Sequence, residues 1–207
     1  MTFPWPLATD QIICYDPEGT PVSCDASGQD AENKSNGTHY DQRFQLDGDI
    51  VFDTVTGLHW CRNANPFEFP YAWQEAQDRV TGMNRSKAHG RADWRLPERR
   101  ELFSLLSHQH INPALQHMHP FSGVFPGYCW SATTCSRLPD QAWYVHLGGA
   151  RVYRGMKKGA YLIWPVAGPG YVAPENDNRF LSIGQKVKDT LTGLYWTETV
   201  TNAPSKD

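Results

Sequence analysis

Long hydrophobic runs, familiar catalytic signatures and closely spaced cysteine pairs are all missing from this sequence. None of its apolar stretches approaches the roughly 18 residues of a membrane-spanning helix, so we expect no such helix. The motifs GxSxG, HExxH, GxGxxG and the P-loop are absent, which removes the usual signs of a hydrolase, a metalloprotease or a nucleotide-binding protein. The five cysteines contain no CxxC pair, so their spacing does not indicate a zinc ribbon or a thioredoxin-type site.

The composition that is present is typical of a folded protein with many turns. Hydrophobic residues make up 40% and aromatic residues 13% of the 207 positions, more than a disordered chain holds. The 15 prolines and 17 glycines interrupt the chain too often for an all-helical fold. A pI near 6.2 gives no support for a dedicated nucleic-acid binder, so we expect no nucleic-acid partner.

The charges divide the chain into two parts. Residues 1–53 hold ten acidic and two basic residues, a net charge of −8, whereas residues 54–207 have a net charge of +5. We assign residues 1–42 to an acidic N-terminal arm. Either this arm lies against a basic body, or the body keeps a basic surface for an anionic ligand.

Cysteine spacing favours two short disulfide loops and one free thiol. Cys14 and Cys24 are ten residues apart, Cys129 and Cys135 are six apart, and Cys61 is left over. Two such bridges are typical of an oxidising compartment, and five reduced thiols in a cytosolic protein are the alternative. The first residues have neither the basic start nor the apolar stretch of a signal peptide. We predict a periplasmic or extracellular protein whose signal peptide has been removed.

The order of the predicted elements indicates an α+β fold. Two short strand-like pieces flank a turn at residues 16–21, and a β-hairpin is predicted at residues 43–60. Apolar residues at helical spacing predict helices over residues 70–83 and 97–110. A run of antiparallel strands follows, at residues 128–134, 141–147, 150–153 and 160–166.

Residues 179–196 repeat residues 43–60, with ten of eighteen positions identical. The repeat predicts a second hairpin, in which Gly193 copies the backbone of Gly57 and Trp196 is buried as Trp60 is. The hairpin segment, taken as residues 175–207, either closes the domain of residues 43–174 or begins a second domain. We favour closure.

Four phrases follow one another in an order that has a counterpart in a known family. They are DTVTGLHW at 53–60, a helix with Trp73 and Ala76, DWRLP at 93–97 followed by Glu101 and Leu102, and WSAT at 130–133 followed by Ala142 and Trp143. Over about residues 43–168 the chain resembles the Lcl C-terminal domain family.

The resemblance implies a C-type-lectin-like fold with two helices, a small twisted antiparallel sheet and hairpins. It also implies export and, for some members, binding of glycans or host surfaces, but it supplies no catalytic residues and no cofactor. Trp60, Trp94, Trp130 and Trp143 become core or core-edge aromatics. We predict in particular that Trp94, Leu96 and Trp130 are buried.

A basic hairpin is the first candidate ligand site. It carries Arg151, Tyr153, Arg154, Lys157 and Lys158 and no acidic residue. Arginine forks match sulfate and carboxylate groups, and Tyr153 is suited to stacking on a sugar. The segment is therefore predicted to bind an anionic ligand, and a solvated turn is the alternative.

A histidine-rich loop is the second candidate site. It contains His108, His110, His117 and His119, and neutral imidazoles bind zinc, copper or nickel. Exposed loop histidines and partly buried, hydrogen-bonded histidines are the alternatives to a metal site.

These features predict a non-catalytic extracytoplasmic module, without cofactor, that binds a glycan, an anionic surface polymer or a protein partner. One alternative is a metal-dependent protein or enzyme that uses the loop from His108 to His119. Another alternative is a structural subunit of a larger surface assembly, in which the acidic arm docks on a neighbour. Homo-oligomerisation is compatible with either binding or structural roles.

Overall fold

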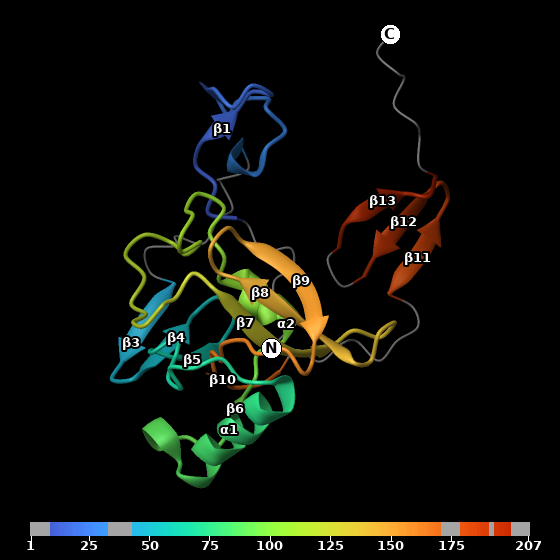
Figure 1. Cartoon of the computed structure of the whole chain (residues 1–207). Helices are drawn as coiled ribbons and strands as arrows, with labels where there is room; N and C mark the ends of the chain where they lie inside the picture. The colour runs from blue at the N-terminus through green and yellow to red at the C-terminus, as the bar shows by residue number, and fades with distance from the viewer. Residues whose placement is uncertain (1–8, 33–42, 171–178, 191–192, 200–207) are drawn as a thin grey trace. The chain divides into compact units, whose positions relative to one another are not determined.

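The computed structural model describes residues 9–32, 43–170, 179–190 and 193–199. The chain forms two compact units, of which one is Ala8–Gly170 and the other contains the C-terminal strands. Helices occur together with antiparallel sheets, which confirms the predicted α+β class (Figure 1). None of the helices in the described ranges is both long and apolar enough to cross a bilayer.

The larger unit contains a five-stranded sheet built from strands that are far apart in sequence. Its members, in spatial order, are β3 (Phe44–Asp47), β4 (Ile50–Asp53), β5 (Leu58–Cys61), β10 (Val166–Ala167) and β6 (Trp94–Arg95). Each neighbouring pair is antiparallel. The hairpin predicted at residues 43–60 supplies the first three strands. Gly57 has a φ of 71° in the turn before β5, a conformation that favours glycine.

A second, three-stranded antiparallel sheet follows the helices. Its strands are β7 (Tyr128–Thr134), β8 (Gln141–His146) and β9 (Arg151–Met156), in that spatial order. The strand predicted at residues 160–166 is only partly formed, because Tyr161 and Leu162 make isolated bridges. Pro165 has no backbone N–H to donate, so regular pairing resumes only at β10.

Helix α1 (Trp73–Arg85) confirms the first predicted helix. Its buried residues Ala76, Val80 and Met83 lie at helical spacing and form one apolar face. At its end, the Asn84 side chain accepts a hydrogen bond from the Trp94 N–H (2.7 Å) and donates one to the Trp94 carbonyl (2.8 Å). The short 3-10 turn η3 (Ala88–Gly90) then leads to β6.

Helix α2 (Arg99–Ser104) is shorter than the 97–110 predicted. The N–H groups of Leu105 and Leu106 still donate to carbonyls three residues back, but from Ser107 the backbone bonds to another part of the chain. The N–H of Ser107 donates to the Ala114 carbonyl at 2.9 Å, and its side-chain oxygen accepts from the N–H groups of Gln109 and His110. This local competition ends the helix early.

The core of the larger unit is aromatic. Trp60, Trp130 and Trp164 are fully buried, and the rings of Trp60 and Trp164 meet edge to face with centroids 5.5 Å apart. Trp94 and Leu96 are also buried, so the three predicted core positions are confirmed.

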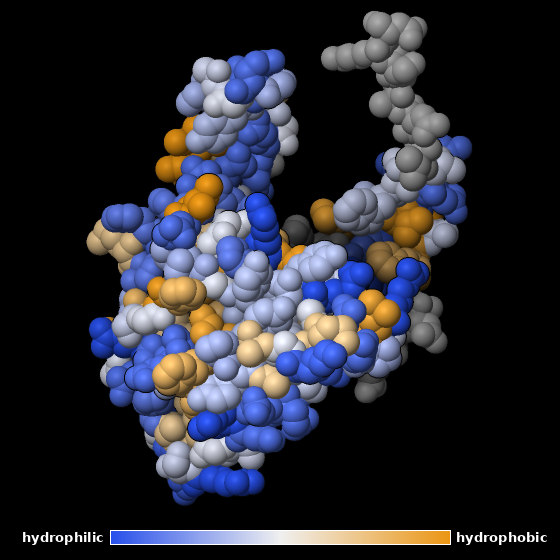
Figure 2. Space-filling model, in the orientation of Figure 1, coloured by the Kyte–Doolittle hydropathy of each residue, from blue (hydrophilic) through white to orange (hydrophobic). Residues whose placement is uncertain are grey.

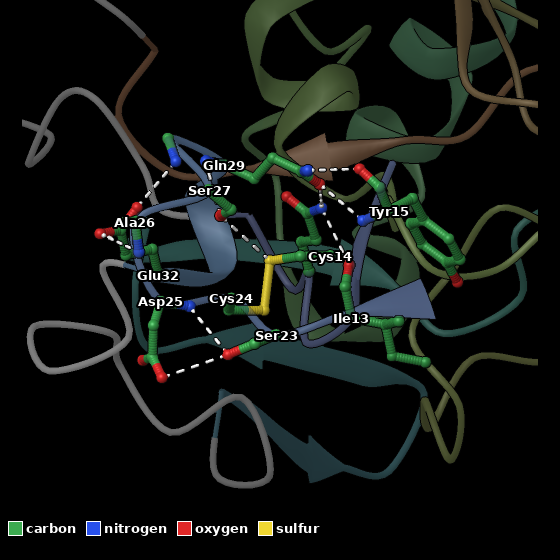
Figure 3. Close-up of a disulfide and its surroundings, with 12 residues drawn as sticks. Ile13, Cys14, Tyr15, Ser23, Cys24, Asp25, Ala26, Ser27, Gln29 and Glu32 are labelled. Carbon is green, nitrogen blue, oxygen red and sulfur yellow. Dashed lines mark hydrogen bonds between the residues drawn. A yellow bond between two sulfur atoms is a disulfide. The ribbon is translucent and has the colours of Figure 1, made fainter. Parts of the chain in front are cut away.

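The first described segment, residues 9–32, is tied by a disulfide. Strands β1 (Cys14–Tyr15) and β2 (Pro21–Val22) form the small predicted hairpin, and Cys14 is bonded to Cys24 beside it (Figure 3). The Gln29 side chain donates to the Tyr15 carbonyl at 2.7 Å, which holds the following turn against the hairpin. The predicted Cys14–Cys24 bridge is confirmed.

The predicted Cys129–Cys135 bridge is wrong. Both residues are buried free thiols, as is Cys61. Cys129 lies near the start of β7 and Cys135 directly follows its end. Six residues of extended chain span about 20 Å, whereas the Cα atoms of a disulfide lie about 4.4–6.8 Å apart.

The C-terminal unit contains the predicted repeat. Strands β11 (Phe180–Ile183), β12 (Lys186–Asp189) and β13 (Tyr195–Thr197) form an antiparallel sheet in chain order. Gly193 has a φ of 75°, so its predicted likeness to Gly57 is confirmed. The prediction that Trp196 is buried is wrong, because the residue is 57% exposed.

Candidate ligand-binding site

The basic hairpin divides between the two faces of the β7–β8–β9 sheet. On β9, Tyr153 lies opposite Tyr144 of β8, and Arg154 lies opposite Trp143. Because successive residues of a strand point to opposite faces, Tyr153 and Arg151 share one face and Arg154 occupies the other. The five residues predicted as one ligand site therefore do not form a single surface.

Arg154 lines a cavity of about 620 Å³ at the edge of this sheet. The complete lining is Arg99, Thr133, Thr134, Cys135, Ser136, Arg137, Leu138, Trp143 and Arg154. We call these residues the arginine pocket. Three guanidinium groups, three hydroxyl groups and an indole face one space, and no carboxylate is among the lining residues.

Each arginine of the pocket comes from a different element. Arg99 is the first residue of α2, where its backbone N–H donates to the Thr133 side chain at 3.0 Å. Its guanidinium carbon lies 4.4 Å from the centroid of the Trp143 ring, a cation–π contact. Arg137 lies in the turn after β7, which is closed by a hydrogen bond from the Gln141 N–H to the Leu138 carbonyl (2.9 Å).

The pocket is cationic because three arginines and no acidic residue line it. Glu101 is buried and accepts two hydrogen bonds from Arg95, both at 2.7 Å, and a third from the Glu98 N–H. The Glu98 carboxylate lies next to the pocket, because it accepts a hydrogen bond from the hydroxyl of the lining residue Thr133. Three arginine forks, with the hydroxyl groups of Thr134 and Ser136, suit a sulfate or carboxylate group.

The two lysines of the predicted site do not line the arginine pocket. The ammonium nitrogen of Lys157 lies 4.2 Å from the centroid of the Trp73 ring, in a cation–π contact with α1. Lys158 is an exposed residue of the turn after β9. Of the predicted set, only Arg154 contributes to the cavity.

Tyrosines cover the opposite face of the sheet. Tyr144 lies at the centre, with ring centroids 4.7 Å from Tyr161, 5.0 Å from Tyr128 and 6.4 Å from Tyr153. Burial, together with the neighbouring phenols, raises the pKa of Tyr144, so this ring stays a neutral hydrogen-bonding group. We call these four residues the tyrosine face. In the orientation of Figure 1, Figure 2 shows hydrophilic residues interleaved with paler and hydrophobic ones over β8 and β9.

The predicted four-histidine metal site does not form. His110 and His117 approach each other, with ring centroids 6.0 Å apart, but His108 packs against Phe103 and His119 against Phe121. Within residues 9–32, 43–170, 179–190 and 193–199, no three His, Cys, Asp or Glu side chains are grouped to hold a metal ion.

The sequence interpretation missed Arg99, Arg137 and Trp143 as ligand-site residues. They are separated by more than thirty positions from α2 to β8, and no local motif joins them. The only signal in the sequence is the surplus of basic residues after residue 53. This surplus indicates an anionic ligand but does not show which residues bind it.

Comparison with known proteins shows the family to which the chain belongs. The chain matches no curated protein. The family model of the Lcl C-terminal domain matches residues 49–167, more than half of the chain, and this range includes the five-stranded sheet from β4 onward and the whole arginine pocket. The chain therefore belongs to the Lcl C-terminal domain family.

Proposed function

We propose that this protein is a non-catalytic, extracytoplasmic binding module with a C-type-lectin-like fold that recognises an anionic glycan or surface polymer. The observation that carries the proposal is the arginine pocket. It offers three guanidinium groups and the Trp143 indole in one cavity of about 620 Å³, a volume within the usual range of small-ligand pockets. Membership of the Lcl C-terminal domain family supports a surface or adhesin-like role.

The disulfide supports the proposed location. Cys14–Cys24 closes a short loop in the N-terminal segment, and such bridges persist in oxidising compartments such as the periplasm or the extracellular space.

Binding of dextran sulfate, compared with uncharged dextran, tests the proposal. These two polymers share a sugar backbone and differ in charge, so a pocket that recognises sulfate binds only the first. A charge-assisted hydrogen bond is worth about 1.5–3 kcal/mol, so Arg154→Ala and Arg137→Ala should each weaken dextran sulfate binding at least about tenfold. The affinity is measured by calorimetry with the full chain.

Arg151→Ala is the matched control. Arg151 lies on the same strand as Arg154 but on the other face, so its loss changes the net charge equally and leaves the pocket intact. Equal weakening by Arg151→Ala and Arg154→Ala would mean that a diffuse surface charge binds the polymer. Equal binding of dextran and dextran sulfate would contradict the anionic ligand.

A further inference from the structure

The C-terminal unit reproduces the start of the larger unit in its hydrogen bonds. In the first copy, Arg43 donates to the Asp53 carboxylate at 2.9 and 2.7 Å. In the second copy, Arg179 donates to Asp189 at 3.0 and 2.8 Å. The strand registers also correspond, since Phe44 pairs with Asp53 and Phe180 with Asp189. The repeat is therefore the same three-stranded structure made twice.

The two copies differ in how their equivalent faces are covered. Val51 and Trp60 lie opposite each other and are fully buried, together with Leu58. Val187 and Trp196 lie opposite each other in the same way, but Trp196 is 57% exposed. We call Phe180, Val187, Leu194 and Trp196 the repeat face. Val187, Leu194 and Trp196 correspond to buried core positions, and Phe180 corresponds to the half-buried Phe44. Three of the four are large exposed apolar residues.

The first copy shows what such a face requires. Strand β10 adds to the outer edge of β5, where Val166 pairs with Trp60 and the Cys61 N–H donates to the Pro165 carbonyl at 3.0 Å. Trp164, two residues before β10, covers Trp60 and donates from its indole to the Cys61 carbonyl at 2.9 Å. A single segment, residues 164–167 with the sequence Trp-Pro-Val-Ala, thus covers both the edge of β5 and the ring of Trp60.

The second copy presents the same edge. The Glu198 N–H donates to the Gln185 carbonyl, as the Arg62 N–H does to Asp49 in the first copy, so Thr197 stands where Cys61 stands. Alternate N–H groups of a strand point to opposite edges, which directs the Thr197 N–H away from β12. In the described part of the chain β13 is the last strand of its sheet, so no strand adds to this edge.

We propose that the outer edge of β13 and the repeat face bind a β10-type segment from a domain of the same family whose own sheet this segment has not entered, because in a folded domain β10 is paired on both edges. The incoming segment forms an antiparallel strand, donates its tryptophan to cover Trp196 and accepts a hydrogen bond from the Thr197 N–H. Strand addition of this kind takes its affinity from main-chain bonds and its specificity from side-chain pockets. The inference goes beyond ligand binding, since it assigns a protein partner to a different unit.

A labelled peptide with the sequence of residues 159–170, GAYLIWPVAGPG, tests the inference with the full chain. We expect saturable one-to-one binding in fluorescence anisotropy. Thr197→Pro removes the outward N–H and should weaken peptide binding at least about tenfold, because proline is tolerated on an edge but cannot donate. Thr197→Val keeps the N–H and is the matched control, expected to bind like the original chain.

A second peptide tests the inference independently of the proline variant, in case that variant does not fold. Replacing the peptide's tryptophan by alanine should also weaken binding to the unmodified chain, because Trp196 then lacks its aromatic cover. Binding that survives Thr197→Pro would place the peptide elsewhere and overturn the inference, as would the absence of binding. Self-association that Thr197→Pro abolishes, without peptide binding, would mean that the β13 edges of two copies pair directly with each other, and would also overturn it.

Discussion

Gly155 has no side chain, which allows the rings of Tyr144 and Tyr161 to approach its backbone closely in the tyrosine face. A Cβ atom at this position would lie 2.7 Å from the Tyr161 hydroxyl and 3.0 Å from a ring carbon of Tyr144. Tyr161 has little room to move, because its ring packs 4.5 Å from Trp130 and its backbone is bonded to Tyr71 in both directions. The glycine is therefore required by the approach of two rings and not by a special backbone angle.

We expect Gly155→Ala to destabilise the larger unit by about 1–3 kcal/mol, the usual cost of overpacking. Gly82→Ala is the matched control, because Gly82 lies in α1 with no atom within 4 Å of the new methyl group. Alanine is the better helix former, so Gly82→Ala should stabilise by about 0.5–1 kcal/mol. Urea denaturation measures both changes, and equal shifts of the two variants would contradict this account.

Single residues were predictable from the sequence where local pattern decides their environment. Trp94 and Trp130 are buried as expected, because each belongs to a phrase that the family resemblance indicated as structural. Trp196 is the instructive failure, since its own sequence matches that of Trp60. Burial of Trp60 depends on Trp164, a residue about a hundred positions away, and the local repeat carries no information about it.

At the scale of elements, β7 decides the state of the cysteines. Its extended backbone separates Cys129 from Cys135, and burial raises the pKa of Cys129 to about 12 and that of Cys61 to about 11. The thiolate is the reactive form of cysteine, so both residues should resist alkylation in the folded protein.

Alkylation under denaturing conditions should therefore find three reactive thiols, at Cys61, Cys129 and Cys135, and five after reduction. Peptide mapping by mass spectrometry without reductant checks which residues are modified. In the folded protein near pH 8, Cys61 and Cys129 should react far more slowly than after unfolding. A peptide pair linked through Cys129 and Cys135 would show that β7 is not formed as described.

Elements with a strong periodic pattern were also predictable, whereas short ones were not. Helix α1 was predictable because its three buried residues recur at helical spacing. Both hairpins were predictable because their sequences repeat each other. Strands β6 and β10 have two residues each, which is too short for any alternation to appear. These two strands form only because they pair with neighbouring strands that are distant in sequence. The arginine pocket is likewise not visible in any local pattern, because α2, a turn and three strands supply its parts.

For the whole molecule, two histidines link stability to pH. Burial lowers the pKa of both His59 and His119 below the ordinary value of 6.5. As the pH falls below about 6.5, the unfolded chain takes up protons that the folded chain does not, so stability must decrease. The stabilising contribution of these residues is complete above that pH and is lost as the pH falls through the folded-state pKa values.

The thermal midpoint should therefore fall between pH 7 and pH 5, before carboxylate titration takes over. A double variant, His59→Gln with His119→Gln, should show a flatter profile over this interval. Calorimetry at half-unit pH steps measures the midpoint, and denaturation at pH 7.5 shows that the variant is folded. The same slope in both proteins would exclude these two histidines as its cause.

The place of β10 in the five-stranded sheet also sets the order of folding. It is the last strand of its unit along the chain, yet it lies between β5 and β6. The contact between Trp164 and Cys61 joins residues 103 positions apart, and such distant contacts slow folding. Until Ala167 has emerged from the ribosome, the edge of β5 and the ring of Trp60 lack their cover, and exposed edges and apolar surface favour aggregation. The five-stranded sheet can therefore be completed only when nearly the whole unit is available.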